Sequence, residues 1–96
     1  MPAVTRYGDA DVTHCSPMTR HGKSIDVFAN GLGISRQDDV NTSHDYPPVV
    51  CLSHAQPITT GSTSVFVNGK GCGRVGDAIT SCTSVAAGSA DVFAGP

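Results

Sequence analysis

Short apolar segments that end in glycine-containing turns dominate the hydrophobic pattern of this 96-residue chain. Three of them resemble one another: residues 24–31 read SIDVFANG, residues 62–69 read STSVFVNG, and residues 89–95 read SADVFAG. Each places a valine before a phenylalanine, residue types that favour strands. The first two end in Asn-Gly, which favours a two-residue hairpin turn with positive φ. The pattern therefore predicts short β-hairpins and no long helix.

A second motif, Arg-x-x-Asp, precedes each of these segments, at residues 6–9, 36–39 and 74–77. A side chain able to bind a metal stands five positions after each aspartate; these side chains are His14, His44 and Cys82. The asparagine of each Asn-Gly pair stands six residues before the next arginine. Matched offsets of this kind indicate three copies of one β unit. The middle copy is longer by eight residues, which fall within 45–60.

The repeat also predicts how the units associate. A single hairpin of this size is only marginally stable in water. We therefore expect three hairpins to surround a pseudo-threefold axis and to share one interior, as a single all-β domain spanning residues 1–96. The loops that follow the three aspartates would then meet on that axis.

Such a meeting point predicts a metal site. Zinc takes four tetrahedral ligands from Cys sulfur, His nitrogen or carboxylate oxygen. The matched positions supply three, and the fourth must come from outside the repeat. The inserted segment offers Cys51 and His54, and Cys15 is a third candidate. A closed set of four ligands is typical of a structural ion, and imidazole together with thiolate favours zinc over iron(II).

The other polar and sulfur-containing side chains have simpler interpretations. We expect His21 to be a surface residue and Cys72 to be a small buried residue. Each repeated arginine is expected to brace its loop, and each repeated aspartate to fix the turn or orient a ligand. These residues are Arg6, Arg36 and Arg74, with Asp9, Asp39 and Asp77.

Composition narrows the class of protein further. With five aromatic residues and no Trp, the chain can build only a thin core, so a metal or a partner subunit is expected to reinforce it. A net charge of −2 excludes the basic face of a typical nucleic-acid-binding protein. The chain shows no apolar leader and no apolar run of about 20 residues. We therefore expect synthesis in a cytosol, with the four cysteines reduced or bound to metal.

Taken together, these motifs resemble those of PAAR-repeat proteins, in particular the stand-alone spike-tip proteins of contractile-tailed bacteriophages. The resemblance covers essentially residues 1–96 and rests on four motifs. They are Gly-Asp-x4-His from Gly8, Gly-Ser-x-x-Val-Phe-Val-Asn-Gly from Gly61, Arg-Val-Gly-Asp-x4-Cys from Arg74, and Gly-Ser-Ala-Asp-Val-Phe-Ala-Gly from Gly88. The chain departs from the family at Asp38, where glycine is usual, and at residues 71–74, where Gly-Cys-Gly-Arg replaces Pro-Ala-Ala-Arg.

The resemblance implies a small conical fold with one structural zinc ion near its apex. In the family three His and one Cys hold the ion, which selects His14, His44, His54 and Cys82. It also implies a mechanical role: one chain caps and sharpens a trimeric β-helical spike that pierces a bacterial envelope. The implied location is the central spike of a phage baseplate, after synthesis in the host cytoplasm, or the secreted spike of a type VI secretion system.

Two other functions are compatible with a metal site in so small a chain. The first is a zinc-dependent hydrolase or toxin, and the second is a free-standing zinc-binding adaptor. Catalytic zinc keeps an open coordination position and normally has a general base nearby. All eight acidic residues are Asp and none is Glu. The closed ligand set therefore favours a protein that is not an enzyme.

Overall fold

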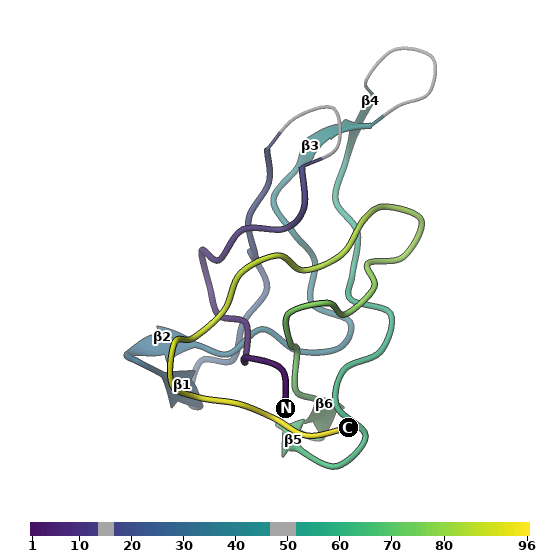
Figure 1. Ribbon diagram of the computed structural model, residues 1–96. Coiled ribbons are helices and arrows are strands. Elements are labelled where there is room, and N and C mark those ends of the chain that lie inside the picture. Colours follow the sequence, from purple (N-terminus) through teal and green to yellow (C-terminus); the bar gives the residue numbers. More distant parts are fainter. Residues whose placement is uncertain (14–16, 47–51) are drawn as a thin grey trace.

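The computed structural model describes residues 1–13, 17–46 and 52–96, and for residues 44–46 and 52–54 it describes the backbone alone. The described part contains short strands and no helix (Figure 1). The strands are β1 (Phe28–Ala29), β2 (Leu32–Gly33), β3 (His44–Tyr46), β4 (Leu52–His54), β5 (Phe66–Val67) and β6 (Lys70–Gly71). They pair as three antiparallel two-stranded sheets, β1–β2, β3–β4 and β5–β6. The predicted all-β class is confirmed.

Two of the hairpins turn at the predicted Asn-Gly pairs. Asn30 and Gly31, between β1 and β2, have φ values of 55° and 78°. Asn68 and Gly69, between β5 and β6, have φ values of 54° and 79°. Two successive positive φ angles define a turn whose twist matches that of the flanking strands. The predicted hairpins at these two places are therefore confirmed.

The third segment pairs with the beginning of the chain instead of forming a hairpin of its own. Phe93 bridges Ala3 in an antiparallel manner, and the backbone N–H of Val4 donates to Val92 O at 2.9 Å. No Asn-Gly pair follows Phe93, so the local sequence has no signal for a tight reversal. The N-terminal residues take the place that β2 and β6 occupy in the other two hairpins.

A ring of three backbone hydrogen bonds joins parts of the chain that are far apart in sequence. The N–H of Thr5 donates to Gly73 O (3.0 Å), that of Ser35 to Thr5 O (3.1 Å), and that of Gly73 to Ser35 O (2.9 Å). Each of the three residues thus donates to one neighbour and accepts from the other. Thr5 and Ser35 are both fully buried, so these polar groups are satisfied within the protein.

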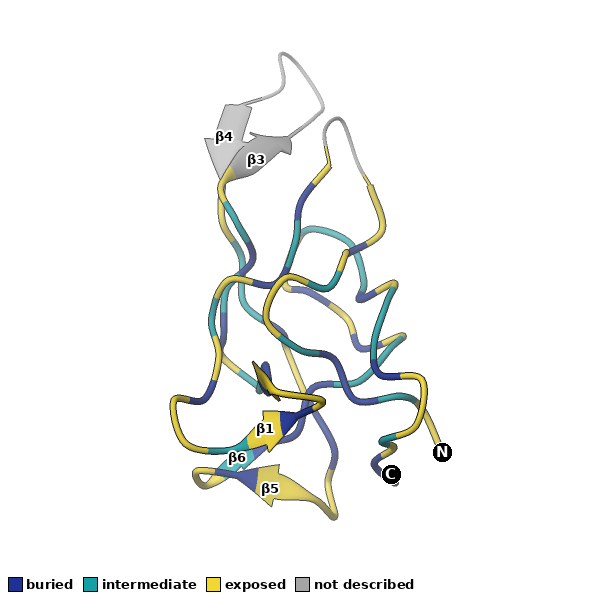
Figure 2. Ribbon diagram, turned by 90° about the vertical axis from the view of Figure 1, so that its left-hand side faces the viewer, coloured by how far each residue is buried: buried dark blue, intermediate teal, exposed yellow. Residues whose placement is uncertain are grey.

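The apolar core is thin and consists mostly of small side chains. One cluster includes one residue each of β1 and β5, and its members are Val4, Ala29, Ile34, Val67, Cys72 and Ala94. A second contains Ile58, Ile79 and Val85. Figure 2 shows buried and exposed positions alternating along β1 and β5. This alternation is expected of strands with one solvated face.

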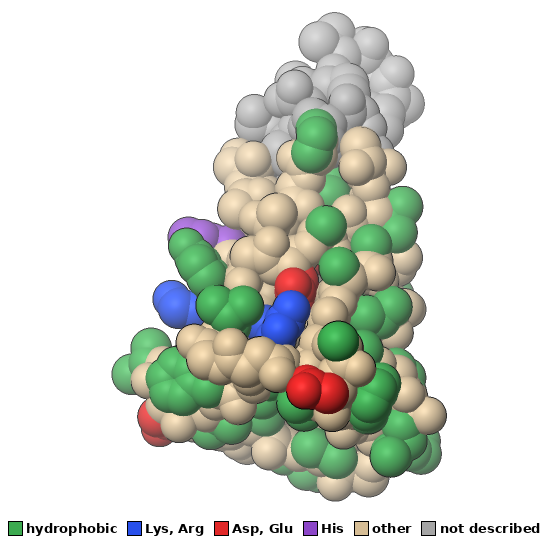
Figure 3. Space-filling view, turned by 60° about the vertical axis from the view of Figure 1, so that its left-hand side comes forward, with side chains coloured by type: hydrophobic (Ala, Val, Ile, Leu, Met, Phe, Trp, Pro, Cys, Tyr) green, Lys and Arg blue, Asp and Glu red, His purple; other side chains and the backbone are tan. Residues whose placement is uncertain are grey.

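The molecule is elongated, with principal extents of 38 × 23 × 21 Å. Hairpins β1–β2 and β5–β6 lie at its broad end together with both chain ends, and β3–β4 lies at the opposite, narrower end (Figure 1). Apolar side chains gather over the broad end on the face drawn in Figure 3. In the described residues, no helix is long and apolar enough to cross a membrane.

Candidate metal centre and its supporting polar network

Strands β3 and β4 bring two predicted ligand positions together. Their register places His44 directly opposite His54. Each of these two paired strands thus carries one predicted histidine ligand. The remaining predicted histidine, His14, lies outside the described residues. The alternative ligands Cys15 and Cys51 also lie outside them.

Cys82, the predicted sulfur ligand, is half-buried in a tight turn. The turn is closed by the Cys82 N–H, which donates to Ile79 O at 3.1 Å, and Ser81 within it has a φ of 50°. Burial and the charge of Asp11 raise the pKa of the Cys82 thiol, and a hydrogen bond from Asn41 and the charge of Arg20 oppose that rise. A bound metal would stabilise the thiolate further, because Cys binds metals in its deprotonated form.

Asn41 connects the Cys82 turn with the two chain segments that flank the β3–β4 hairpin. Its Nδ2 group donates to Cys82 Sγ at 3.9 Å. Its Oδ1 atom accepts from the N–H of Gln56 at 2.9 Å, and its own N–H donates to Gln56 O at 3.1 Å. Asn41 thus connects the three chain segments that carry His44, His54 and Cys82.

The donor chemistry of this region fits a thiolate–imidazole site for zinc. A half-buried sulfur accepts an N–H hydrogen bond beside a hairpin that pairs two histidine positions. Among the side chains that the structure describes, no three His, Cys, Asp or Glu residues are gathered closely enough to hold a metal. Three of the four predicted ligands have no described side chain, so the ligand set stays a prediction.

A buried ion pair that the motifs did not predict lies next to this region. Arg20 Nη2 donates to Asp11 Oδ2 at 3.0 Å, and both side chains have 0% of their surface exposed. Arg20 Nη1 donates to Asp39 O at 3.3 Å, whereas Arg20 Nε has no hydrogen-bond partner. Burial lowers the pKa of Arg20, against the raising effect of Asp11. Arg20 is the arginine that does not belong to an Arg-x-x-Asp block. Its position outside the blocks is the sequence signal that could have pointed to a separate role.

The three Arg-x-x-Asp blocks form the predicted braces. In each, the arginine N–H donates to the aspartate Oδ2 at 2.8 Å, and the guanidinium donates to the same carboxylate. The residue before each aspartate has positive φ: 87° at Gly8, 73° at Asp38 and 92° at Gly76. Asp38 therefore adopts the backbone conformation that glycine provides in the other two blocks. The turn-fixing role predicted for the motif aspartates Asp9, Asp39 and Asp77 is confirmed by their bonds to the arginine N–H groups.

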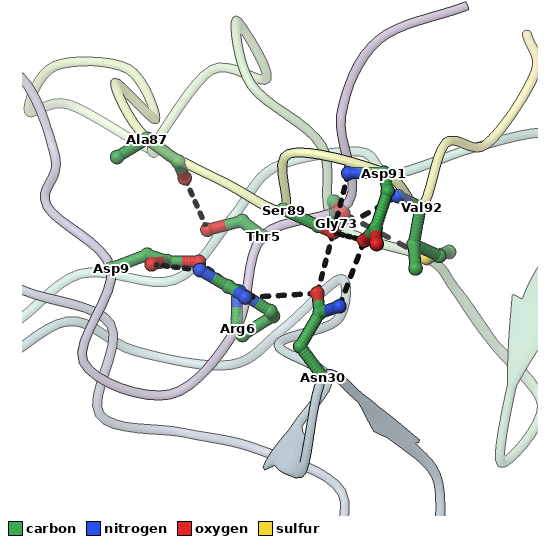
Figure 4. Close-up of polar contacts among 10 residues, drawn as sticks. Thr5, Arg6, Asp9, Asn30, Gly73, Ala87, Ser89, Asp91 and Val92 are labelled. Carbon is green, nitrogen blue, oxygen red and sulfur yellow. Dashed lines mark hydrogen bonds and ion pairs between the residues drawn. The ribbon is translucent and has the colours of Figure 1, made fainter.

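The asparagine of each Asn-Gly turn joins one brace to a distant segment. Asn30 Oδ1 accepts from Arg6 Nη1 at 2.9 Å, and its Nδ2 donates to Asp91 at 2.8 Å (Figure 4). Asn68 does the same between Arg36 and Asp26, with both distances 2.9 Å. These asparagine bonds are the main cause of the lowered pKa values of Asp91 and Asp26.

At the third position the contact is made by backbone. Gly95 stands where the other units have asparagine, and Ser64 stands where they have aspartate. Arg74 Nη1 donates to Gly95 O at 2.7 Å, and Ser64 Oγ donates to Pro96 O at 2.6 Å. Loss of the asparagine thus coincides with loss of the aspartate that it would have bound.

Two further predictions about single residues are confirmed. His21 is exposed, near the ring of Tyr7 with a centroid distance of 6.5 Å. Cys72 is buried in the first core cluster with 1% of its surface exposed. Burial raises the pKa of the Cys72 thiol to about 11.

No family model matches this chain, and no match was found among curated proteins. The similarity to PAAR-repeat proteins is therefore a prediction from the motifs.

Proposed function

We propose that this protein is a PAAR-like tip, a structural zinc-binding cap on a trimeric β-helical spike that pierces a bacterial envelope. In this proposal the chain consists of three pseudo-threefold-related β units that taper to the metal site. It acts through its shape and stiffness and catalyses no reaction. The observation that carries the proposal is the cyclic pattern of contacts at the broad end.

That pattern is cyclic at several levels. Thr5, Ser35 and Gly73 donate to one another in a closed ring. One position further along the chain, each of the three arginines begins an identical brace. A single chain with such an arrangement offers a threefold partner three similar contact surfaces. A single tip chain can therefore contact all three chains of a trimeric spike in a similar way.

Apolar exposure at the broad end supports the same partner. Phe28, Phe66 and Phe93 occupy equivalent positions in the three units, and they expose 57%, 61% and 49% of their surfaces. Ile25, which precedes β1, exposes 85%. Repeated half-exposed aromatic residues are typical of a surface that another protein covers. In this proposal the spike's strands continue into the broad end of the tip by main-chain hydrogen bonds.

The proposed ligands of the ion are His14, His44, His54 and Cys82. When bound, zinc would cross-link the loop of the first unit, the β3–β4 hairpin and the Cys82 turn. Such a cross-link contributes folding free energy directly, which a protein with a thin core needs at its narrow end.

Metal content tests the zinc part of the proposal. Elemental analysis of purified protein should give about one zinc per chain, and Cys82→Ala or His44→Ala should abolish it. Both substitutions should also lower the midpoint of thermal unfolding, because the site contributes to folding. Wild-type protein that is folded and free of metal would contradict the proposed centre.

The identity of the fourth ligand has its own test. His54→Ala should lose the ion, and Cys51→Ala should keep it. The reverse result would assign the fourth position to Cys51 in place of His54. Cys15→Ala should keep the ion and serves as a control beside His14.

Binding to the spike tests the mechanical role. Mixed with a trimeric β-helical spike protein from the same source, the protein should form a complex of one tip chain per trimer, measured by light scattering. Replacing Phe28, Phe66 and Phe93 by Asp should abolish this complex and leave the zinc content unchanged. Val12→Asp, another exposed apolar position outside the three repeated segments, is the matched control. A complex with three chains per trimer would contradict the capping arrangement.

A further inference from the structure

We propose that Asn41 is a positioning residue of the metal centre, which holds the Cys82 sulfur and aligns the β3–β4 hairpin with it. This inference rests on the proposed zinc site. It adds a role for a residue that stands outside the repeated motifs and that none of the sequence patterns singled out.

The hydrogen bonds fix which way the Asn41 amide points. Asn41 Oδ1 faces the N–H of Gln56, a group that can only donate. The Nδ2 group must therefore face the other direction, where it lies 3.9 Å from Cys82 Sγ. Only 1% of the Asn41 surface is exposed, so water does not compete for either bond.

The position of Asn41 in the chain couples it to the predicted histidines. It stands three residues before His44, and Gln56 stands two residues after His54. The backbone of Asn41 is also bonded to Gln56, through a 3.1 Å bond from its N–H. Asn41 and Gln56 thus join the two chain segments just below the paired positions of His44 and His54. A shift of Asn41 would move the hairpin relative to the sulfur.

An N–H donor also changes the chemistry of a sulfur ligand. It lowers the energy of the lone pairs on the thiolate sulfur, so it alters the strength and the electronic character of the metal–sulfur bond. Asn41 would act on the ion in both ways, through the sulfur and through the hairpin. Neither effect requires Asn41 to touch the metal.

Cobalt(II) provides a direct readout, because its bond to a thiolate absorbs light by charge transfer from sulfur to metal. In cobalt-loaded protein, Asn41→Asp should move this absorption to longer wavelength, because the sulfur loses its N–H donor. Asp keeps the oxygen that accepts from Gln56, so the hairpin stays attached. Asn41→Ala removes both contacts, and it should shift the band and weaken zinc binding by about 10- to 100-fold in a chelator competition.

Asn68→Asp is the matched control. This substitution places a carboxylate against Asp26, which Asn68 contacts at 2.9 Å, so it should destabilise the fold while the cobalt band stays where it is. Unfolding of the metal-free proteins, followed in parallel, measures how much each change costs the fold itself.

The possible outcomes separate this inference from the proposed function. If the wild-type protein takes up neither zinc nor cobalt, the metal centre is wrong and the role of Asn41 falls with it. If the wild type binds both metals but the Asn41 variants keep its band position and its zinc affinity, the metal centre stands and the inference is overturned. A band shift in the Asn41 variants and not in Asn68→Asp supports it.

Discussion

Arg20 and Asp11 form an ion pair from which water is fully excluded. Removing two charges from water carries a large desolvation cost, which their attraction and further hydrogen bonds must offset. Arg20 gains a second bond, to the backbone oxygen of Asp39, and thereby connects the pair to the middle Arg-x-x-Asp brace. Each of the two buried charges is therefore tolerated only as long as the other is present.

Removal of one partner should be more damaging than removal of both. Arg20→Met would remove the Arg20 cation from beside the buried Asp11 carboxylate, and it should lower the free energy of unfolding by about 3–5 kcal/mol. The double variant Arg20→Met/Asp11→Leu should recover most of this loss, because it buries no charge. Urea denaturation of the three proteins measures the difference. A double variant as unstable as the single one would show that the ion pair itself stabilises the fold.

Cys72 should make stability fall in the alkaline range. Burial raises its pKa from 9.0 to about 11 in the folded protein, so the unfolded chain loses the proton first as pH rises. The contribution is fully present below about pH 9 and is lost towards pH 11, with a slope of up to about 1.4 kcal/mol per pH unit. Chemical denaturation between these values measures the slope. Cys72→Ala, which keeps every other titrating group, should show a shallower one.

Sequence motifs predicted some of these residues and missed others. The arginine braces and buried Cys72 follow from local spacing and residue type, and both were found as expected. Arg20 was missed because its partner Asp11 is nine positions away and belongs to no repeated motif. Asn41 was missed for the same reason, since its contacts are made with Gln56 and Cys82, 15 and 41 positions away.

At the scale of elements, the two Asn-Gly hairpins serve both as turns and as connectors. Their asparagines adopt positive φ and also bridge an arginine of one unit to an aspartate of another. The turn could be predicted from the Asn-Gly pair alone. The bridge could not, because Asn30 and Asp91 are 61 positions apart. Similarly, no local pattern near Phe93 indicates that Ala3 is its partner.

These bridges should be visible as two independent pKa changes. Asn30→Ala should raise the pKa of Asp91 towards its ordinary value and leave Asp26 unchanged. Asn68→Ala should raise the pKa of Asp26 and leave that of Asp91 unchanged. The lowered pKa values favour the folded state above the ordinary carboxyl range, and this contribution is lost as pH falls through them. NMR titration of the two carboxyl groups measures both shifts. Equal shifts of both groups in one variant would contradict separate bridges.

At the scale of the whole molecule, the ring of Thr5, Ser35 and Gly73 sets how closely the three chain segments that contain these residues approach one another. A Cβ atom added at Gly73 would lie 2.4 Å from Ser35 O and 3.0 Å from Thr5 and Ile58 side-chain atoms. Because the added atom would meet a backbone oxygen and two buried side chains at once, the ring has little room to adjust. Offsets in the sequence predicted three units, but which residues meet at the centre depends on packing that spacing alone does not specify.

Gly73→Ala should therefore be much more damaging than a glycine change in open space. The added methyl group would push the ring apart and cost about 3 kcal/mol or more. Gly31→Ala is the matched control: its Cβ would meet nothing within 4 Å, and only the φ of +78° opposes it, at a cost of about 1–2 kcal/mol. Thermal and urea denaturation compare the two. Equal losses would mean that the ring tolerates expansion.

The closed ring also has a consequence for how fast the protein folds and unfolds. Its contacts join residues that are 30, 38 and 68 positions apart, and the bond from Thr5 to Ala87 spans 82 positions. Such long-range contacts form only after most of the chain has lost its freedom, so we expect slow folding for a protein of this size. Unfolding should be slow as well, because none of the three ring segments can detach before the ring opens. The fold should therefore resist brief mechanical loads that exceed what its equilibrium stability alone would withstand.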